Sequence, residues 1–313
     1  MKRLEKWAFI VNPIAGNGYA GRHIDEVERM ITQYAVDAEV VTTEGVGHAT
    51  ELARDFISKG YKYIAPVGGD GTISEAAQAV VGHADLVFAP VSMGTGNDFI
   101  QIVGFSDHFT EKDWSVYFQK ETILMDVGEC NGHYFLNGLG LGFDAEVAAQ
   151  NYNEEGLKKG GKDKYLWHIL KTLLTYHEHP MTVLNNGKTE MSNCFINTVS
   201  IGRRFAAGYF LTPQAYANDG LLDVCLIREL KFLQRFKIFT MVPSGSHLQH
   251  PQVHYFRTDS LHLAFDRKVP HHMDGELFFA SEFQIRIHPK KLNIIYNSKG
   301  KHYFQSCSPM HTD

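Results

Sequence analysis

The sequence has few cysteines, no long apolar run and no excess of positive charge. Its 313 residues include four cysteines, none of them in a Cys-x-x-Cys pair, so neither a zinc knuckle nor a disulfide framework is predicted. No window approaches the ~20 apolar residues of a membrane-spanning helix. The chain has 30 Lys and Arg residues and 35 Asp and Glu residues, which gives a net charge of −5. This charge argues against nucleic-acid binding, which requires a strongly positive surface.

The first residues also lack the apolar core of a secretory signal, because Met1–Arg3 begin a short charged segment. We therefore expect a cytoplasmic protein. Hydrophobic residues make up 44% and charged residues 21% of the chain, which is ordinary for a globular protein with a sizeable core. The length is compatible with two domains or one large domain.

The first part of the chain alternates strand-like and helix-like segments. Expected strands cover residues 7–11, 38–43, 63–67 and 86–91, and expected helices cover residues 20–34, 49–59 and 73–81. Pro90 interrupts the fourth strand. Strands that alternate with helices predict a parallel sheet with helices on both faces. We therefore predict an α/β domain for this part.

After about residue 125 the pattern changes to short strand-like runs separated by turns. These runs cover residues 123–127, 134–138, 194–201, 222–227, 260–265, 277–279 and 284–288. Residues 164–177 are the main helical exception, with leucines at helical spacing. The pattern predicts a β-rich second domain, such as a sandwich.

Two glycine-rich segments give weak signals for phosphate binding. Residues 16–21 (GNGYAG) fit the dinucleotide fingerprint G-x-G-x-x-G. We interpret them as a turn whose backbone amides approach phosphate, with an ordinary strand-to-helix turn as the alternative. Residues 156–163 nearly match the P-loop pattern, but Asp163 replaces the final hydroxyl residue and no strand precedes them. We reject this second segment as a nucleotide site and interpret it as a solvated basic loop.

Residues 68–72 (GGDGT) give a far more specific signal, after one expected strand and before a helix. Three glycines in four positions let backbone amides turn toward an anion without Cβ clashes. The helix places its positive end at the same point. Asp70 then lies where it could coordinate Mg²⁺. The alternative, a tight turn capped by Asp70, does not require so many glycines.

Residues 90–99 repeat this pattern one strand later and end in Asn97-Asp98-Phe99. In an open α/β sheet, loops at the carboxyl ends of strands line one crevice. The turns after the first, third and fourth strands should therefore converge. They would bring together the side chains of Asn12, Thr72, Thr95, Asn97, Asp70 and Asp98. This set predicts a site for polyphosphate and Mg²⁺ rather than for nicotinamide.

Four segments together resemble the diacylglycerol kinase catalytic-domain superfamily, and within it the soluble bacterial lipid kinases. The segments are residues 12–16 (NPIAG), 68–72 (GGDGT), 94–99 (GTGNDF) and 273–276 (MDGE). They occur in the family's order, and the resemblance covers nearly the whole chain. The GGDGT motif is shared with NAD kinases, whereas the late Asp-Gly-Glu and the β-rich second part favour lipid kinases.

The resemblance implies a two-domain fold with the active site in the cleft between the domains. It implies a three-layer α/β nucleotide-binding domain with a parallel sheet over residues 1–124, to which residues from about 297 to 313 return. It implies an antiparallel β-sandwich domain for the lipid substrate over residues 125–296.

The resemblance also implies site residues. The implied ATP-binding residues are Asn12, Pro13, Ile14, Ala15, Gly16, Thr43, Gly68, Gly69, Asp70, Gly71, Thr72 and Thr95. Glu276 is implied as the general base, with Asp70 and Asp98 beside Mg²⁺. A structural Mg²⁺ is implied at Tyr216, Asp219 and Leu221, where Asp219 gives its carboxylate and the other two give backbone carbonyls. Oxygen ligands suit a hard cation, and a plain turn is the alternative.

The implied activity is transfer of the γ-phosphoryl group of ATP to a lipid hydroxyl, and we expect diacylglycerol to be converted to phosphatidic acid. A sphingoid base, a monoacylglycerol or phosphatidylglycerol stays open as the acceptor. A non-catalytic nucleotide- or lipid-binding regulator is the alternative from another class. We expect transient, peripheral contact with the inner face of the membrane, because acyl chains are insoluble. A homodimer stays open.

Two segments have open roles. Residues 158–171, with Tyr165, Leu166 and Trp167 beside several lysines, either lie at a membrane interface or pack as a helix on the second domain, which we favour. His271 and His272 directly precede the MDGE motif. They either flank a loop, which we favour, or contact the substrate.

Overall fold

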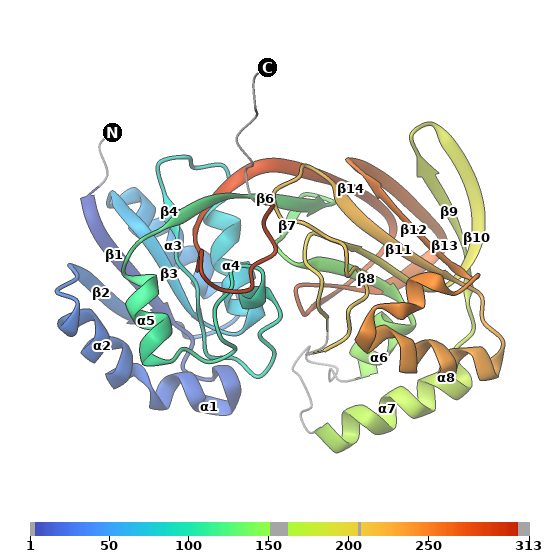
Figure 1. The fold of residues 1–313 in the computed structure, drawn as a ribbon, viewed down its shortest axis with the longest axis horizontal. Coiled ribbons are helices and arrows are strands. Elements are labelled where there is room, and N and C mark those ends of the chain that lie inside the picture. Colours follow the sequence, from blue (N-terminus) through green and yellow to red (C-terminus); the bar gives the residue numbers. More distant parts are fainter. Residues whose placement is uncertain (1–3, 151–161, 206–207, 306–313) are drawn as a thin grey trace. The chain divides into compact units, whose positions relative to one another are not determined.

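The computed structural model describes residues 4–150, 162–205 and 208–305, and the chain divides into two compact units (Figure 1). The first unit comprises Met1–Asp126, Tyr216–Leu221 and Pro289–Asp313, and the second comprises Val127–Ala215 and Leu222–His288. The segment 156–161 with most of the near-P-loop pattern, residues 158–161 of the basic stretch, and the last eight positions of the tail, 306–313, lie outside the described residues.

The first unit is built on parallel strands. They are β1 (Leu4–Val11), β2 (Ala38–Thr42), β3 (Tyr61–Gly68), β4 (Val87–Phe88) and β5 (Val91–Ser92). Strand β1 pairs in parallel with β2 and β3, and β3 pairs in parallel with β4 and β5. Pro90 lies between β4 and β5 because proline has no N–H for the ladder. The end of β14 (Glu276–Ile295) joins this sheet, with Ile294 opposite Phe88.

The helices of the first unit are α1 (Ala15–Arg22), α2 (Ile24–Gln33), α3 (His48–Ser58), α4 (Asp70–Val80) and α5 (Glu111–Tyr117), with a 3₁₀ turn η1 (Phe99–Gln101). The single helix expected over residues 20–34 is wrong. It is divided at His23, whose Nδ1 lies 2.8 Å from Tyr19 O, the carbonyl that a continuous helix would pair with the His23 N–H. That N–H donates to Ala20 O instead, at 3.1 Å.

The second unit consists mainly of antiparallel strands. They are β7 (His133–Phe135), β8 (Gly138–Gly142), β9 (His179–Asn185), β10 (Lys188–Ser200), β11 (Leu222–Arg228), β12 (Val253–Thr258) and β13 (Ser260–Met273). Strand β6 (Thr122–Cys130) and β14 contribute residues to both units. Neighbouring strands follow the order β12-β11-β10-β8-β13-β14, and β9 pairs with β10 and β13. The helices are α6 (Phe143–Gln150), α7 (Lys162–Thr175) and α8 (Phe232–Met241), with 3₁₀ turns η2 (Val242–Ser244) and η3 (Ser246–Gln249).

Several predictions for the second part of the chain were incomplete. The pattern did not reveal β9, β12, α6 or α8. The single strand expected over residues 134–138 is wrong, because β7 ends at Phe135 and β8 begins at Gly138. The runs expected at 277–279 and 284–288 belong to one strand, β14, and the polar pair Ser281 and Glu282 between them hid its continuity. Helix α8 was missed because apolar residues lie on its exposed side as well as its buried side, so its sequence lacks a single apolar stripe. His271 and His272 lie within β13, not in a loop.

Arg235 on α8 joins this helix to the end of α7. Its Nη1 donates to the carbonyls of Leu173 and Tyr176, both at 3.0 Å. Its Nη2 donates to both carboxylate oxygens of Glu178, at 2.8 and 2.9 Å. The Arg235 and Glu178 side chains are 10% and 7% exposed. Because the last carbonyls of a helix have no intrahelical partner, the guanidinium caps α7 and holds α8 against it.

Three cysteines lie in the described residues, Cys130, Cys194 and Cys225, and all are buried and free. Burial raises the pKa of their thiols to about 12, 11 and 12, respectively. They therefore carry no thiolate near neutral pH. Within the described ranges, no helix is both long enough and apolar enough to cross a bilayer.

We predict that Arg235→Met destabilises the protein, because it leaves the Glu178 carboxylate buried without its cation. Breaking a buried pair from one side costs about 3–5 kcal/mol. The matched control is the double variant Arg235→Met, Glu178→Met. It removes both charges and should lose clearly less stability than the single variant. Thermal unfolding followed by circular dichroism measures the difference. An equal loss in the single and double variants would contradict the explanation.

Candidate functional site

The turn after β1 has a left-handed backbone. Gly16, Asn17 and Gly18 have φ values of +63°, +56° and +80°. A Cβ at Gly16 would lie 2.5 Å from Met93 O, so only glycine lets this turn approach the loop after β5. Asn12 Nδ2 donates to Thr72 Oγ1 at 2.9 Å. The turn after β1 is therefore in contact with the segments that follow both β3 and β5.

The turns after β3 and β5 approach each other through glycine backbone. A Cβ at Gly94 would lie 2.3 Å from Gly69 Cα, and a Cβ at Gly69 would lie 3.1 Å from Gly94 Cα. Met93 N–H donates to Gly68 O at 2.7 Å. Gly69 is the N-cap of α4, so the first amides of this helix, which have no intrahelical acceptor, lie at the junction. A helix N-terminus lined by glycine is suited to an anion.

Asp70 and Asn97 hold the loop after β5 in place. The Asp70 carboxylate accepts hydrogen bonds from the N–H groups of Asp98 (2.9 Å) and Phe99 (3.2 Å). Asn97 Oδ1 accepts from Gly94 N–H at 3.0 Å, and Asn97 Nδ2 donates to Asp107 O at 2.8 Å. Asp70 therefore has a scaffold role that the sequence did not reveal. Its role beside a metal, like that of the buried Asp98, stays a prediction.

The remaining expected ATP-binding residues lie around the same junction in the first unit. Pro13, Ile14 and Ala15 lie between β1 and the left-handed turn, Gly71 and Thr72 lie in the first turn of α4, Thr95 follows Gly94, and Thr43 follows β2. Ile14 is 78% exposed, whereas Thr43 is buried. Thr43 N–H donates to Val11 O at 2.8 Å. The structure thus brings the turns after β1, β3 and β5 together, and Thr43 lies beside the end of β1.

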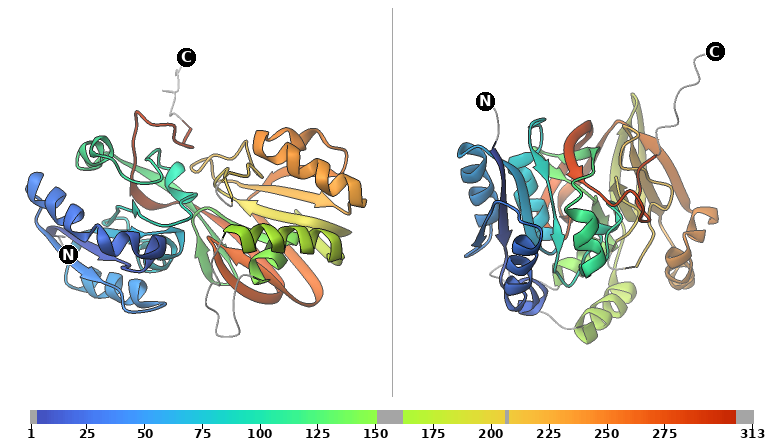
Figure 2. Two further views of the ribbon diagram at one scale, coloured as in Figure 1. Left: turned by 90° about the horizontal axis from the view of Figure 1, so that it is seen from below. Right: turned by 60° about the vertical axis from the view of Figure 1, so that its left-hand side comes forward.

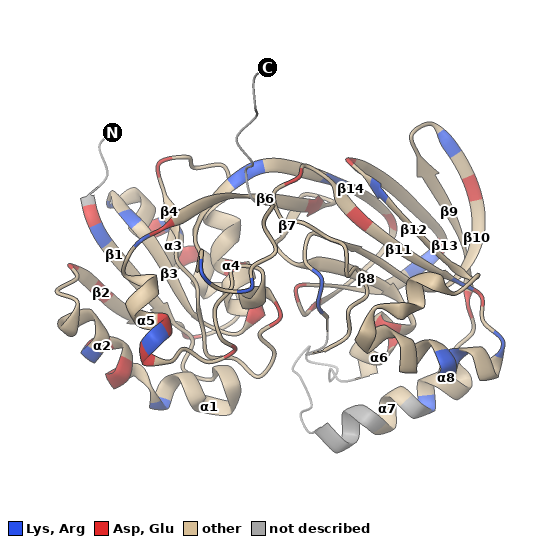
Figure 3. Ribbon diagram, viewed as in Figure 1, with Lys and Arg blue, Asp and Glu red and all other residues tan. Residues whose placement is uncertain are grey.

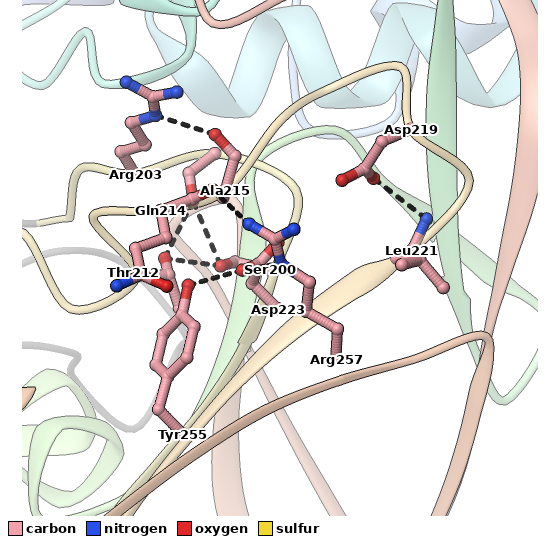
Figure 4. A network of polar contacts seen from close by, with 11 residues as sticks. Ser200, Arg203, Thr212, Gln214, Ala215, Asp219, Leu221, Asp223, Tyr255 and Arg257 are labelled. Carbon is pink, nitrogen blue, oxygen red and sulfur yellow. Dashed lines mark hydrogen bonds and ion pairs between the residues drawn. The ribbon is translucent and has the colours of Figure 1, made fainter. Parts of the chain in front are cut away.

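The expected Mg²⁺ loop lies next to a carboxylate that was not predicted. Asp219 Oδ1 accepts from Leu221 N–H at 3.1 Å (Figure 4). The fully buried Asp126 accepts from the N–H groups of Gly220 (2.7 Å) and Lys290 (2.8 Å). Burial raises the pKa of Asp126, and the charge of Asp219 raises it further, against the lowering effect of those two hydrogen bonds. The sequence signal was a single aspartate within the apolar strand β6.

This donor set fits a hard cation. The Asp219 carboxylate, the neighbouring Asp126 and the backbone carbonyls of Tyr216 and Leu221 are all oxygen donors, which Mg²⁺ prefers. A cation would offset the repulsion between the two carboxylates. Among the described residues, no group of three or more His, Cys, Asp or Glu side chains could hold a metal. Backbone carbonyls would therefore have to complete the coordination.

The segment that precedes this loop belongs to the second unit and is fixed by Asp223. Tyr255 Oη and Arg257 Nε both donate to the buried Asp223 carboxylate, Arg257 at 3.0 Å (Figure 4). Arg257 Nη2 also donates to Gln214 O at 2.6 Å. This network ties the chain just before the loop to strands β11 and β12.

In the second unit, the MDGE motif forms a two-residue hairpin turn between β13 and β14. Asp274 and Gly275 have φ values of +48° and +86°, as a type I′ turn requires. The Asp274 carboxylate accepts from three successive backbone N–H groups, those of Leu136, Asn137 and Gly138, at 2.6, 2.9 and 3.0 Å. Asp274 therefore anchors the hairpin, and Glu276 opens β14 as a partly exposed residue.

The two histidines before this turn have different surroundings. His272 Nε2 lies 3.0 Å from Asp144 Oδ2, and a Cβ at Gly140 would lie 2.2 Å and 2.3 Å from these two atoms. His271 is 4% exposed. Burial lowers the pKa of His271 to about 4, helped by the neighbouring His272. His271 is therefore neutral and part of the core. His272 pairs with Asp144, and the missing side chain of Gly140 leaves room for this pair.

Comparison with known proteins matches both parts of the chain. Residues 6–130 match the diacylglycerol kinase catalytic domain. Residues 138–296, just over half of the chain, match the YegS C-terminal NAD kinase beta sandwich-like domain. The resemblance inferred from the four sequence segments is thereby confirmed, as is a two-domain organisation.

Individual relatives agree with these matches. The diacylglycerol kinase of Staphylococcus carnosus (strain TM300) is 22% identical over 270 residues, which cover 85% of this chain and 87% of that protein. The diacylglycerol kinase of Bacillus subtilis (strain 168) is 23% identical over 279 residues, covering 87% and 90%. The crystal structure of a diacylglycerol kinase from Bacillus anthracis str. Sterne shares the fold, with a TM-score of 0.76, 24% identity and coverage of 96% and 99%. The chain belongs to the family of diacylglycerol kinases and YegS-like lipid kinases.

Proposed function

We propose that the protein transfers the γ-phosphoryl group of ATP to the hydroxyl of diacylglycerol and so forms phosphatidic acid. Membership of a lipid kinase family supports ATP as the donor. The names of the two relatives from Staphylococcus carnosus and Bacillus subtilis support diacylglycerol as the acceptor. The observation that carries the proposal is the backbone contact of Gly69 with Gly94 at the N-terminus of α4.

The triphosphate would bind at this junction. The α4 N-terminus offers amide donors and the positive end of a helix, and the glycines leave room for phosphate oxygens close to the backbone. Asn12 and Thr72, which are hydrogen-bonded to each other, would border the phosphates. Mg²⁺ held near Asp70 and Asp98 would supply neutralising charge to the phosphates when bound.

Phosphoryl transfer passes through a loose transition state, so the protein contributes mainly positioning and charge stabilisation. In the proposed reaction the acceptor hydroxyl oxygen bonds to the γ-phosphorus, the bond to the β-phosphate oxygen breaks, and ADP leaves. Glu276 would take the hydroxyl proton. Asp274, with three backbone hydrogen bonds, would position the hairpin that carries Glu276.

A structural Mg²⁺ is proposed at the loop of Tyr216, Asp219 and Leu221, next to Asp126. The buried Asp126 already accepts two backbone hydrogen bonds, so Asp219 would be the carboxylate ligand. The ion would stabilise the loop rather than take part in the reaction. The proposed substrate also implies peripheral contact with a membrane, since its acyl chains lie in a bilayer.

A lipid panel with radiolabelled ATP tests the acceptor. We expect the highest kcat/KM for diacylglycerol, compared with monoacylglycerol, phosphatidylglycerol and a sphingoid base presented in the same mixed micelles. A higher value for one of the other lipids would replace diacylglycerol as the substrate. Absence of phosphate incorporation into every lipid would overturn the assignment and favour a non-catalytic role.

Glu276→Gln keeps the size of the side chain but removes its basicity. We predict a loss in kcat of about 100-fold or more, because a positioned base contributes about 10²–10⁴-fold, with the Kd for ATP unchanged. Glu282→Gln is the matched control, since Glu282 is an exposed residue of the same strand. Turnover near the wild-type rate in Glu276→Gln would remove this residue from the mechanism.

A graded series of alanines tests the glycine junction. Gly69→Ala should raise the Kd for ATP about tenfold, equal to ~1.4 kcal/mol, because the two turns must separate by a few tenths of an ångström. Gly94→Ala should have the larger effect, since its Cβ would lie 2.3 Å from Gly69 Cα. A Cβ at Gly96 would meet only Asp70 Oδ2, at 4.0 Å, so Gly96→Ala is the control. Isothermal titration gives the Kd, and any other order of effects contradicts the steric argument.

The Mg²⁺ loop predicts a metal-dependent stability. Mg²⁺ at about 100 times its Kd should raise the free energy of unfolding by about 2.7 kcal/mol, and Asp219→Asn should abolish this increase. Asn218→Ala is the control, because Asn218 hydrogen-bonds to Gln305 and is not a proposed ligand. Thermal unfolding with Mg²⁺ and with EDTA measures both. An equal Mg²⁺ effect in wild type and Asp219→Asn would exclude Asp219 as a ligand.

A further inference from the structure

Helices α7 and α8 of the second unit expose large apolar side chains. Trp167 and Leu174 on α7 are 65% and 62% exposed, and Phe232, Leu233 and Phe236 on α8 are 49%, 77% and 39% exposed. These are five of the eleven exposed large hydrophobic side chains in the described part of the chain. We call these five residues the α7–α8 apolar face.

On each helix the exposed residues occupy the side away from the core. Trp167, Lys171 and Leu174 are spaced i, i+4 and i+7, so they form one stripe along α7, whereas Leu173 is buried. On α8, Phe232 and Phe236 are one turn apart with ring centroids at 5.1 Å, whereas Ile238 and Arg235 are buried. The residues of the α7–α8 apolar face are thus not part of the core that the other sides of these helices form.

The two stripes belong to one piece of structure. Arg235 of α8 donates to the carbonyls of Leu173 and Tyr176 at the end of α7, and both helices contribute to the same core with Leu173, Tyr176 and Ile238. Figures 1 and 2 show α7 and α8 on the same part of the second unit. The α7–α8 apolar face therefore belongs to two helices that are packed and hydrogen-bonded to each other.

Within residues 167–175 and 231–241 the exposed charged side chains are all lysines, and the exposed Glu229 lies just before α8. Lys171, Lys231 and Lys237 are exposed, and the stretches 167–175 and 231–241 contain no Asp or Glu. Figure 3 shows blue and no red along these stretches of α7 and α8. Aromatic and leucine side chains bordered by lysines are the pattern of a helix that lies on an anionic bilayer. The same pattern opposes self-association, because two copies would bring their lysines together.

We propose that the α7–α8 apolar face docks the protein on an anionic lipid bilayer. Trp167, Leu233 and Phe236 enter the boundary between headgroups and acyl chains, and the lysines lie against lipid phosphates. This inference rests on the proposed function, in which the acceptor is a bilayer lipid. It assigns the contact to described residues of both helices, of which α8 was not expected from the sequence at all.

Tryptophan fluorescence tests insertion directly. The chain has three tryptophans, and Trp7 and Trp114 are fully buried, so Trp167 is the one that contacts added vesicles. We expect vesicles with about 30% phosphatidylglycerol and brominated acyl chains to quench the emission, and Trp167→Phe to abolish the quenching. Unchanged emission of the wild-type protein at saturating vesicle concentrations would overturn the proposal.

Vesicle sedimentation tests which residues of α7 and α8 contribute to vesicle binding. The triple variant Phe232→Ser, Leu233→Ser, Phe236→Ser should lower the partition coefficient about tenfold or more, because partition scales with the apolar area buried. Met191→Ser, at a side chain 74% exposed on β10, should not change it. Lys171→Glu with Lys237→Glu should weaken binding to phosphatidylglycerol vesicles more than to phosphatidylcholine vesicles. Wild-type partition of the triple variant, or an equal loss in Met191→Ser, would overturn the proposal.

Two further measurements separate the possible failures. Phosphorylation of a short-chain diacylglycerol dissolved as monomers tests the proposed function without a bilayer, and the triple variant should keep wild-type kcat there while losing activity on vesicles. Loss of kcat on both substrates would mean that the residues act on the reaction and not on docking. Analytical ultracentrifugation shows the state of the free protein. A wild-type dimer that the triple variant converts to a monomer would assign this face to a second copy of the chain instead.

Discussion

The contact between the backbones of Gly69 and Gly94 is the constraint on which the proposed phosphate-binding site of this protein depends. The turns after two neighbouring strands come so close that a Cβ on Gly94 would lie 2.3 Å from Gly69 Cα. Gly16 repeats the requirement where the turn after β1 meets Met93 O. The glycines therefore do more than permit a tight turn. They bring three strand ends together at the start of α4, where the proposed phosphate site lies.

Three aspartates, two of them in the motifs, serve as anchors for backbone amides. Asp70 accepts from two N–H groups of the loop after β5, Asp274 accepts from three at the start of β8, and Asp126 accepts from two beside the proposed Mg²⁺ loop. A carboxylate that accepts hydrogen bonds from several backbone N–H groups holds the loop that contains those groups in place. In each case the neighbouring residue with a proposed chemical role, such as Glu276 after Asp274, is held by the anchor.

In the second unit, a buried polar contact joins helices α7 and α8. Arg235 caps the carbonyls of α7 and pairs with Glu178 in a buried site, and Leu173, Tyr176 and Ile238 contribute to one core, so α7 and α8 are joined by polar and apolar contacts. Their remaining apolar side chains stay on the outside. The proposed docking face uses these residues, which the core does not require.

The sequence by itself determined the family, the alternation of strands and helices in the first part, the break at Pro90, and the glycine turns. Each of these depends on residue types and spacings that are local in the chain. It did not reveal the break at His23, the existence of α8, the continuity of β14, or the partnership of Asp126 with Asp219. Asp126 and Gly220 are hydrogen-bonded although they are far apart in the chain, as are Asp274 and Leu136. Only the tertiary structure decided these long-range contacts, because a contact between distant segments depends on how strands pair and cannot be read from the neighbours of either residue. The break at His23 has a local cause, the contact of its side chain with Tyr19 O, which the apolar spacing did not show.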